Sequence, residues 1–303
     1  MINENENFNG TWPFKAKFFT GNGFRQHYVD EGNKSGKLIL CLHGEPTWGY
    51  LYRNFIRDLS REFRIIVPDH MGFGKSETPQ NKEYTLKTHV ENLTNLIDYL
   101  NLSDIYLVGQ DWGGPIMGAY TLNNTQRVKG LFLINTLFGY SKVKQSKKLM
   151  PWFKWIKKHY EDKTLEGILG ELNTTILSVM KIINFTNHNI INDDWLKAYS
   201  SPFPDRKSCI GAINFPLDAL LARMRPYLIE CLKSGDMTSF LKKPAELVYG
   251  MKDMAIDPEY AIRDFNTLFP KQQVTKLINA GHFSQEDEPD KIISLLRSFV
   301  INN

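Results

Sequence analysis

The sequence has few of the features that mark secreted, membrane-bound or metal-binding proteins. It contains only three cysteines, too few and too scattered for a disulfide framework or a zinc site: Cys41, Cys209 and Cys231. No apolar run is long enough to cross a bilayer, and residues 1–10 are polar, without the apolar stretch of a signal peptide. These absences predict a soluble cytoplasmic protein with reduced thiols and no membrane partner.

The chain also has little excess charge and no internal repeat. Its 37 basic and 33 acidic residues leave a formal net charge of +4. The basic residues are not interleaved with a recognisable nucleic-acid-binding motif, so we expect no nucleic-acid partner. With 303 residues, 42% of them hydrophobic, the chain is long enough to bury a large core.

Short apolar runs alternate with helical patterns along most of the chain. Strands are predicted at 37–42, 64–68, 105–108 and 128–134, with helices between them, and this order indicates a parallel sheet with crossover helices. Strand-like runs vanish after residue 137 and resume at 245–249 and 273–278. We therefore predict an α/β fold with helices on both faces of a mostly parallel sheet. Its core domain comprises 1–137 and 222–303, and a helical cap domain of 138–221 is inserted between two strands.

One predicted strand ends in Gly109-Gln110-Asp111-Trp112-Gly113-Gly114. A strand, a sharp turn and a helix around one reactive side chain form a nucleophile elbow, which lifts that side chain clear of the sheet. The reactive position holds a carboxylate here. Asp111 considered alone is more typical of a helix N-cap. The flanking glycines, with an acid and a histidine later in the chain, favour the nucleophile.

Two further polar residues follow predicted strands at the same sheet edge. Asp253 ends Gly-Met-Lys-Asp after one strand, and His282 follows Ala-Gly after the last. The chain order of nucleophile, acid and histidine is that of the α/β-hydrolase triad. Asp257 is an alternative acid. Asp253 is preferred because it lies nearer the strand end, which leaves Asp257 to cap the helix that opens at Pro258.

The wording of these motifs resembles the haloalkane dehalogenases of the α/β-hydrolase superfamily, from about residue 14 to residue 299. The matching stretches are His43-Gly44-Glu45-Pro46-Thr47-Trp48, Gln110-Asp111-Trp112-Gly113-Gly114, Pro202-Phe203-Pro204-Asp205, Gly250-Met251-Lys252-Asp253 and Ala280-Gly281-His282-Phe283. The chain is similar to the subgroup that takes its triad acid from the later strand and a halide-binding group from a cap tryptophan. Other subgroups carry Asn in place of Glu45 and an acid after the strand that here ends in Asn135-Thr136.

The resemblance implies a mechanism without metal or organic cofactor. The Asp111 carboxylate displaces halide from a small apolar halogenated substrate and forms an alkyl ester. His282, oriented by Asp253, then activates a water that hydrolyses the ester. Backbone N–H groups of Glu45 and Trp112 are the predicted oxyanion hole.

The leaving halide requires neutral donors in a dry pocket, which indole N–H groups supply. Trp112 is the first predicted halide donor because it adjoins the nucleophile. For the second, Trp155 is preferred over Trp152 because it lies deeper in the helical run, although both could be packing residues of the cap. Trp195 ranks lower, since three polar residues before it suggest an exposed helix start.

Two other functions fit the same pattern. An epoxide hydrolase shares the fold and the Asp-His-Asp triad and activates its substrate with two cap tyrosines, for which Tyr140, Tyr160 and Tyr199 are available. Gln110 and Glu45 argue against it. The other is a ligand-binding protein with little or no turnover. Whichever of the three functions holds, we expect a monomer or weak dimer.

Overall fold

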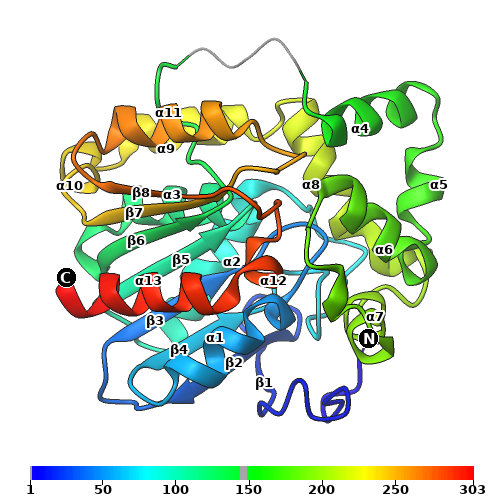
Figure 1. The fold of residues 1–303 in the computed structure, drawn as a ribbon, viewed down its shortest axis with the longest axis horizontal. Helices are drawn as coiled ribbons and strands as arrows, with labels where there is room; N and C mark the ends of the chain where they lie inside the picture. Colours follow the sequence, from blue (N-terminus) through cyan, green and yellow to red (C-terminus); the bar gives the residue numbers. More distant parts are fainter. Residues whose placement is uncertain (1, 144–148) are drawn as a thin grey trace.

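A single sheet organises the computed structural model, which describes residues 2–143 and 149–303 (Figure 1). Eight strands in these ranges pair in the order β1-β2-β4-β3-β5-β6-β7-β8. Their bounds are β1 Lys17–Phe19, β2 Gln26–Gly32, β3 Leu38–Leu42, β4 Arg64–Pro68, β5 Ile105–Gln110, β6 Val128–Ile134, β7 Ala245–Gly250 and β8 Gln273–Leu277. Strand β2 is antiparallel to β1 and β4, and the pairs from β4 to β8 are parallel. The predicted fold class is confirmed.

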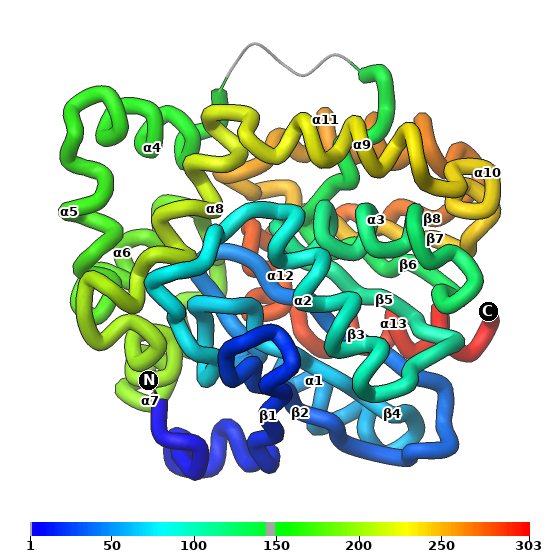
Figure 2. The backbone as a smooth tube through the Cα atoms, turned by 180° about the vertical axis from the view of Figure 1, so that it is seen from behind, coloured from blue at the N-terminus to red at the C-terminus, as the bar shows by residue number. Residues whose placement is uncertain are grey.

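The central strands are buried on both faces. Strands β3 and β5 contain no exposed residue and pair in register, with Leu40 opposite Leu107 and Cys41 opposite Val108. Helices α1 (Arg53–Leu59) and α13 (Pro289–Asn302) cover one face, and α2 (Leu86–Tyr99) and α3 (Gly113–Asn123) cover the other (Figures 1 and 2). Helical cover on both sides explains why these strands are continuous apolar runs.

Further helices complete this part of the chain. They are the 3-10 helices η1 (Gly49–Tyr52) and η2 (Thr125–Arg127), α11 (Pro258–Leu268) between β7 and β8, and α12 (Ser284–Asp287) before α13. Each of α11 and α13 has a proline in its first turn, where the missing N–H removes no intrahelical hydrogen bond.

Between β6 and β7 the described residues form helices joined by loops. The helices are α4 (Pro151–Glu161), α5 (Leu165–Leu169), α6 (Leu172–Ile183), η3 (His188–Ile190), α7 (Asp193–Ser200), η4 (Arg206–Cys209), α8 (Ile210–Leu220), α9 (Arg225–Ser234) and α10 (Met237–Phe240). Helices α4 to α8 lie beyond the carboxyl ends of the parallel strands, at the right of Figure 1. The predicted cap includes residues 144–148, which lie outside the described residues. Helices α9 and α10 were not anticipated, and both contact α3 in the core.

The polar N-terminal segment is packed against the rest of the molecule. Phe8 is fully buried and meets the rings of Trp48 and Tyr50 edge-on. Lys75 Nζ donates hydrogen bonds to the backbone oxygens of Glu4 and Glu6, each at 2.8 Å. Across the described helices, none combines the length and apolar character that crossing a membrane requires.

Candidate active site

The stretch between β5 and α3 is a strained turn that presents Asp111. Asp111 has φ of 50°, a left-handed conformation that is uncommon for a residue with a side chain. The two glycines that follow allow α3 to start close to its neighbours. A Cβ at Gly113 would lie 2.3 Å from the Leu42 oxygen, and one at Gly114 would lie 2.1 Å from Thr136 Oγ1. The glycine pair is therefore a steric requirement of this turn.

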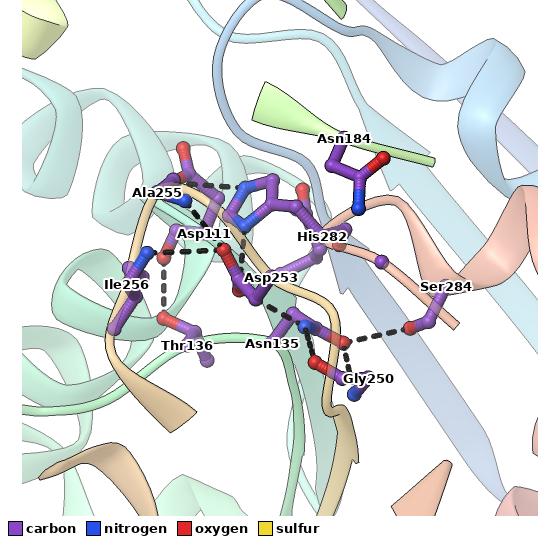
Figure 3. A network of polar contacts seen from close by, with 12 residues as sticks. Asp111, Asn135, Thr136, Asn184, Gly250, Asp253, Ala255, Ile256, His282 and Ser284 are labelled. Atoms are coloured by element: carbon purple, nitrogen blue, oxygen red, sulfur yellow. Dashed lines mark hydrogen bonds and ion pairs between the residues drawn. The ribbon is translucent and has the colours of Figure 1, made fainter. Parts of the chain in front are cut away.

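The two oxygens of the Asp111 carboxylate have different neighbours. Oδ1 accepts a 2.9 Å hydrogen bond from the Glu45 backbone N–H, and Oδ2 lies 3.4 Å from His282 Nε2 (Figure 3). Gly44 makes this approach feasible, because a Cβ there would lie 2.3 Å from Asp111 Oδ1. The loop after β3 thus supplies a donor to the carboxylate on the side away from the histidine.

Asp253 and His282 form a buried pair next to Asp111. His282 Nδ1 donates to Asp253 Oδ2 at 2.8 Å, and both side chains are almost completely buried. The other oxygen, Oδ1, accepts the backbone N–H groups of Ala255 (2.7 Å) and Ile256 (3.0 Å). Asp257 instead caps α11 through the Glu259 N–H. The structure therefore brings Asp111, His282 and Asp253 into one chain of contacts and leaves Asp257 outside it.

Asn135 is a site residue whose role was not anticipated. It follows β6, and its Nδ2 donates to Asp253 Oδ2 at 3.0 Å. Its Oδ1 accepts from the Gly250 N–H and from Ser284 Oγ, both at 2.9 Å. The available signal was its position, a polar residue at the carboxyl end of a strand adjacent to the one that carries Asp253.

Electrostatic interactions set the protonation of two groups at the site. Burial opposes protonation of His282, but Asp253 and Asp111 outweigh it and raise the pKa of His282 to about 10. Burial, reinforced by the charge of Asp111, raises the pKa of the Glu45 carboxyl well above its ordinary value. Neither Glu45 side-chain oxygen has a hydrogen-bond partner among the described residues. The site therefore favours the neutral form of the Glu45 carboxyl and the protonated form of His282.

A cavity of about 420 Å³ opens onto these residues. Its lining includes Asp111, His282 and the carboxyl-bearing Glu45, and also the indoles of Trp112 and Trp152. These lining residues come from the loops at the sheet edge and from the helical segment between β6 and β7. Among the described lining residues there is no lysine or arginine. The cavity therefore suits an uncharged apolar molecule.

The tryptophans divide between the cavity and the packed interior. Trp155 is not among the residues that line the cavity; its ring stacks on Trp152, with centroids 5.3 Å apart. Trp195 is buried rather than exposed, against Phe185 and Tyr199. The structure thus places Trp112 and Trp152 in the lining of the cavity and Trp155 outside it.

The tyrosines also lie apart from the cavity, with one exception. The lining contains Tyr260 of α11 but none of Tyr140, Tyr160 and Tyr199. The Tyr199 hydroxyl donates to Glu286, and Tyr140 is buried beside Phe138. In the part of the chain that the structure describes, no group of three or more His, Cys, Asp or Glu side chains is arranged to hold a metal ion.

Comparison with known proteins assigns the family. The family described as alpha/beta hydrolase fold matches residues 37–289. Haloalkane dehalogenase 2 of Mycobacterium tuberculosis is 32% identical over 94% of each chain. A cis-3-alkyl-4-alkyloxetan-2-one decarboxylase of Shewanella oneidensis is 30% identical over 95% of this chain and 89% of that protein. The crystal structure of a mutant haloalkane dehalogenase DatA from Agrobacterium tumefaciens has a TM-score of 0.79 at 25% identity, covering 95% of this chain and 96% of that one. The chain therefore belongs to the α/β-hydrolase family, and within it to the haloalkane dehalogenases.

Proposed function

We propose that the protein hydrolyses haloalkanes to an alcohol and halide through a covalent ester on Asp111. The observation that carries this proposal is the contact chain Asp111–His282–Asp253 at a cavity that is also lined by two indoles. In the first step an Asp111 oxygen attacks the carbon that bears the halogen. The new carbon–oxygen bond forms as the carbon–halogen bond breaks, and the halide leaves with the bonding electron pair.

In the second step His282 acts as the base. It removes a proton from water, whose oxygen attacks the ester carbonyl carbon. The bond from that carbon to the alkoxy oxygen then breaks, and the alkoxide takes a proton from the His282 imidazolium and leaves as the alcohol, which regenerates the Asp111 carboxyl group. The tetrahedral oxyanion accepts hydrogen bonds from the backbone N–H groups of Glu45 and Trp112. The Glu45 N–H already donates to Asp111 Oδ1, which supports this assignment. The net reaction consumes one water and releases one proton with each halide.

The charge on Asp111 couples the two steps. In the free protein this charge contributes to the high pKa of His282. Esterification neutralises Asp111, so the pKa of His282 falls and the imidazole becomes a more available base once there is an ester to hydrolyse. The Asp253 carboxylate remains to orient the imidazole and to stabilise the imidazolium that forms.

We propose Trp112 and Trp152 as the two halide donors. Both line the cavity, and Trp112 is fixed against the parallel ring of Phe215 at 4.5 Å. Trp155, preferred from the sequence, is assigned a supporting role because it stacks on Trp152. Residues 138–221 are proposed to form the cap domain. Pro216 and Leu220 of α8 line the cavity beside Trp152 and so bound the space for the substrate.

The alternative functions have less support. An epoxide hydrolase requires cap tyrosines at the substrate, whereas Tyr140, Tyr160 and Tyr199 do not line the cavity. A protein that only binds a ligand does not require the contact chain Asp111–His282–Asp253. A second candidate is decarboxylation of an oxetan-2-one, favoured by the 30% identity to a protein of that name. Such a ring is uncharged and would suit the same cavity.

Halide release from terminal bromoalkanes of increasing chain length tests the proposal. Wild-type protein should release halide and acidify an unbuffered solution. Asp257→Asn should do the same, because Asp257 lines the cavity but is not part of the contact chain Asp111–His282–Asp253. Asp111→Asn should release none. If wild type releases no halide but converts a cis-3,4-dialkyloxetan-2-one to an alkene, or an epoxide to a diol, the corresponding alternative replaces the proposal.

A further inference from the structure

The residue after α6 has an unusual backbone conformation. Asn184 has φ of 91° and ψ of 128°, in the left-handed half of conformational space that favours glycine. A residue with a side chain persists in such a conformation only where its surroundings hold it, and these residues concentrate at functional sites. The contacts of Asn184 show what holds it here.

The Asn184 backbone is joined to the loop that carries the histidine. Its carbonyl oxygen accepts the N–H of His282 at 2.8 Å and lies 3.4 Å from the N–H of Phe283. Gly281 passes so close that a Cβ there would lie 2.6 Å from the same oxygen. Figure 3 shows Asn184 beside His282, on a different segment of the chain. A residue of the helical segment thus fixes the backbone of the histidine.

The Asn184 side chain reaches the loop that carries the acid. Its Nδ2 donates to the Lys252 carbonyl oxygen at 2.7 Å, one residue before Asp253. On the other side of Asp253, the Met254 N–H donates to the Ile183 oxygen at 3.2 Å, and the Met254 oxygen accepts the Trp152 N–H at 3.0 Å. Asp253 is therefore flanked by two residues that are bonded to the helical segment.

We propose that Asn184 is a positioning residue that fixes His282 and Asp253 relative to each other. It touches neither Asp111 nor the cavity, so it acts through the two loops. Asparagine suits the position because it tolerates positive φ and its amide donates to Lys252. Glycine tolerates the conformation but lacks the donor, and a carboxylate has only acceptors. The inference rests on the proposed function, because that function gives His282 its role as the base.

The Asn184 contacts should matter for ester hydrolysis and not for ester formation. His282 is required after the ester has formed, whereas ester formation needs only the Asp111 carboxylate and the halide donors. Loss of the Asn184 contacts should therefore slow ester hydrolysis and leave ester formation almost unchanged. Such a variant releases one halide per protein in a rapid burst and then turns over slowly.

Rapid mixing with a bromoalkane, followed by halide detection, separates the two steps. For Asn184→Ala and Asn184→Asp we expect the steady-state rate to fall by about 10- to 100-fold, as for misplaced catalytic groups, and the burst rate to stay within about threefold of wild type. Asn184→Gly should lie between these and wild type, because it keeps the backbone conformation and loses only the side-chain bond. Asn101→Ala, at an exposed asparagine with φ of 48° after α2, is the matched control and should behave as wild type.

The outcomes are distinct. Burst kinetics in the Asn184 variants support the inference, whether or not Tm falls. A steady-state rate equal to that of wild type overturns it. A parallel fall of burst rate, steady-state rate and Tm also overturns it, because that pattern indicates a purely structural role. If wild-type protein itself releases no halide from any bromoalkane, the proposed function fails, and that result is recognised before any variant is compared.

Discussion

Glu45 donates its backbone N–H to Oδ1 of Asp111 at 2.9 Å, while its own carboxyl group is buried beside that carboxylate without a hydrogen-bond partner among the described residues. Two neighbouring carboxylate charges repel each other more strongly in a buried site than in water. The raised pKa of Glu45 resolves the conflict, because the neutral acid carries no charge. Glu45 thus donates a backbone hydrogen bond to the nucleophile, and its uncharged side chain lines the cavity.

Glu45→Gln should therefore be well tolerated. The amide is uncharged and has nearly the same shape as the neutral acid, so the substitution removes no interaction that is specific to the transition state. We therefore expect kcat/KM for a bromoalkane within about threefold of wild type. Glu45→Ala leaves space next to the nucleophile and should lower Tm. A loss of more than about 100-fold in Glu45→Gln would mean that the ionised carboxylate is needed.

Substitution distinguishes the roles of the two tryptophans of α4. Trp152→Phe removes a proposed halide donor from the cavity and should weaken bromide binding by about 10-fold or more, the cost of one lost hydrogen bond to a charged group. Trp155→Phe, the matched control three residues on, should change it little. Bromide inhibition of haloalkane turnover measures both. The reverse order would assign the halide donor to Trp155.

Asn135 holds three groups around the acid, so its loss should affect stability as well as activity. Asn135→Leu leaves the Gly250 N–H and Ser284 Oγ without their acceptor. A buried donor that loses its partner destabilises a protein by about 1–3 kcal/mol, and urea unfolding is the measurement. Asn124→Leu, at a partly exposed asparagine outside the site, is the control. Equal stability of Asn135→Leu and wild type would contradict the network.

Stability should depend on pH through His282. Its pKa is raised to about 10 in the folded protein, above its ordinary value of 6.5. The raised pKa means that the folded state holds the proton more tightly, so this stabilisation is fully present below pH 6.5 and is lost as pH rises toward 10. The free energy of unfolding of wild type, minus that of His282→Gln, should therefore decrease between pH 6.5 and 10. A difference that is flat or grows over this window would contradict the assigned charge.

Much of the fold was accessible from the sequence because the central strands are continuous buried runs. The predicted bounds of β4 and β6 agree with the structure, and those of β3, β5, β7 and β8 differ by one or two residues at one end. Helices α9 and α10 were missed because no recognisable motif lies in them and because the amphipathic pattern of α9 is weak. The cap is hardest to predict, since its helices take their direction from contacts with distant loops.

The site shows the same division. Residues that follow strands could be grouped, because parallel strands end at one edge. The choice between Trp152 and Trp155 could not be made this way: they are three residues apart on one helix, and their side chains stack. Asn184 lies at a helix end far from either triad loop in the sequence, so only the folded chain reveals its hydrogen bonds to Lys252 and His282.

The central claim is the covalent ester on Asp111, and trapping it is the most direct test. His282→Phe removes the base and should stop the reaction after the first step. After incubation with a bromoalkane, mass spectrometry should find the alkyl group on the peptide that contains Asp111, with one halide released per protein. An unmodified Asp111 peptide in His282→Phe, from a preparation whose wild type turns over the same bromoalkane, would contradict the mechanism.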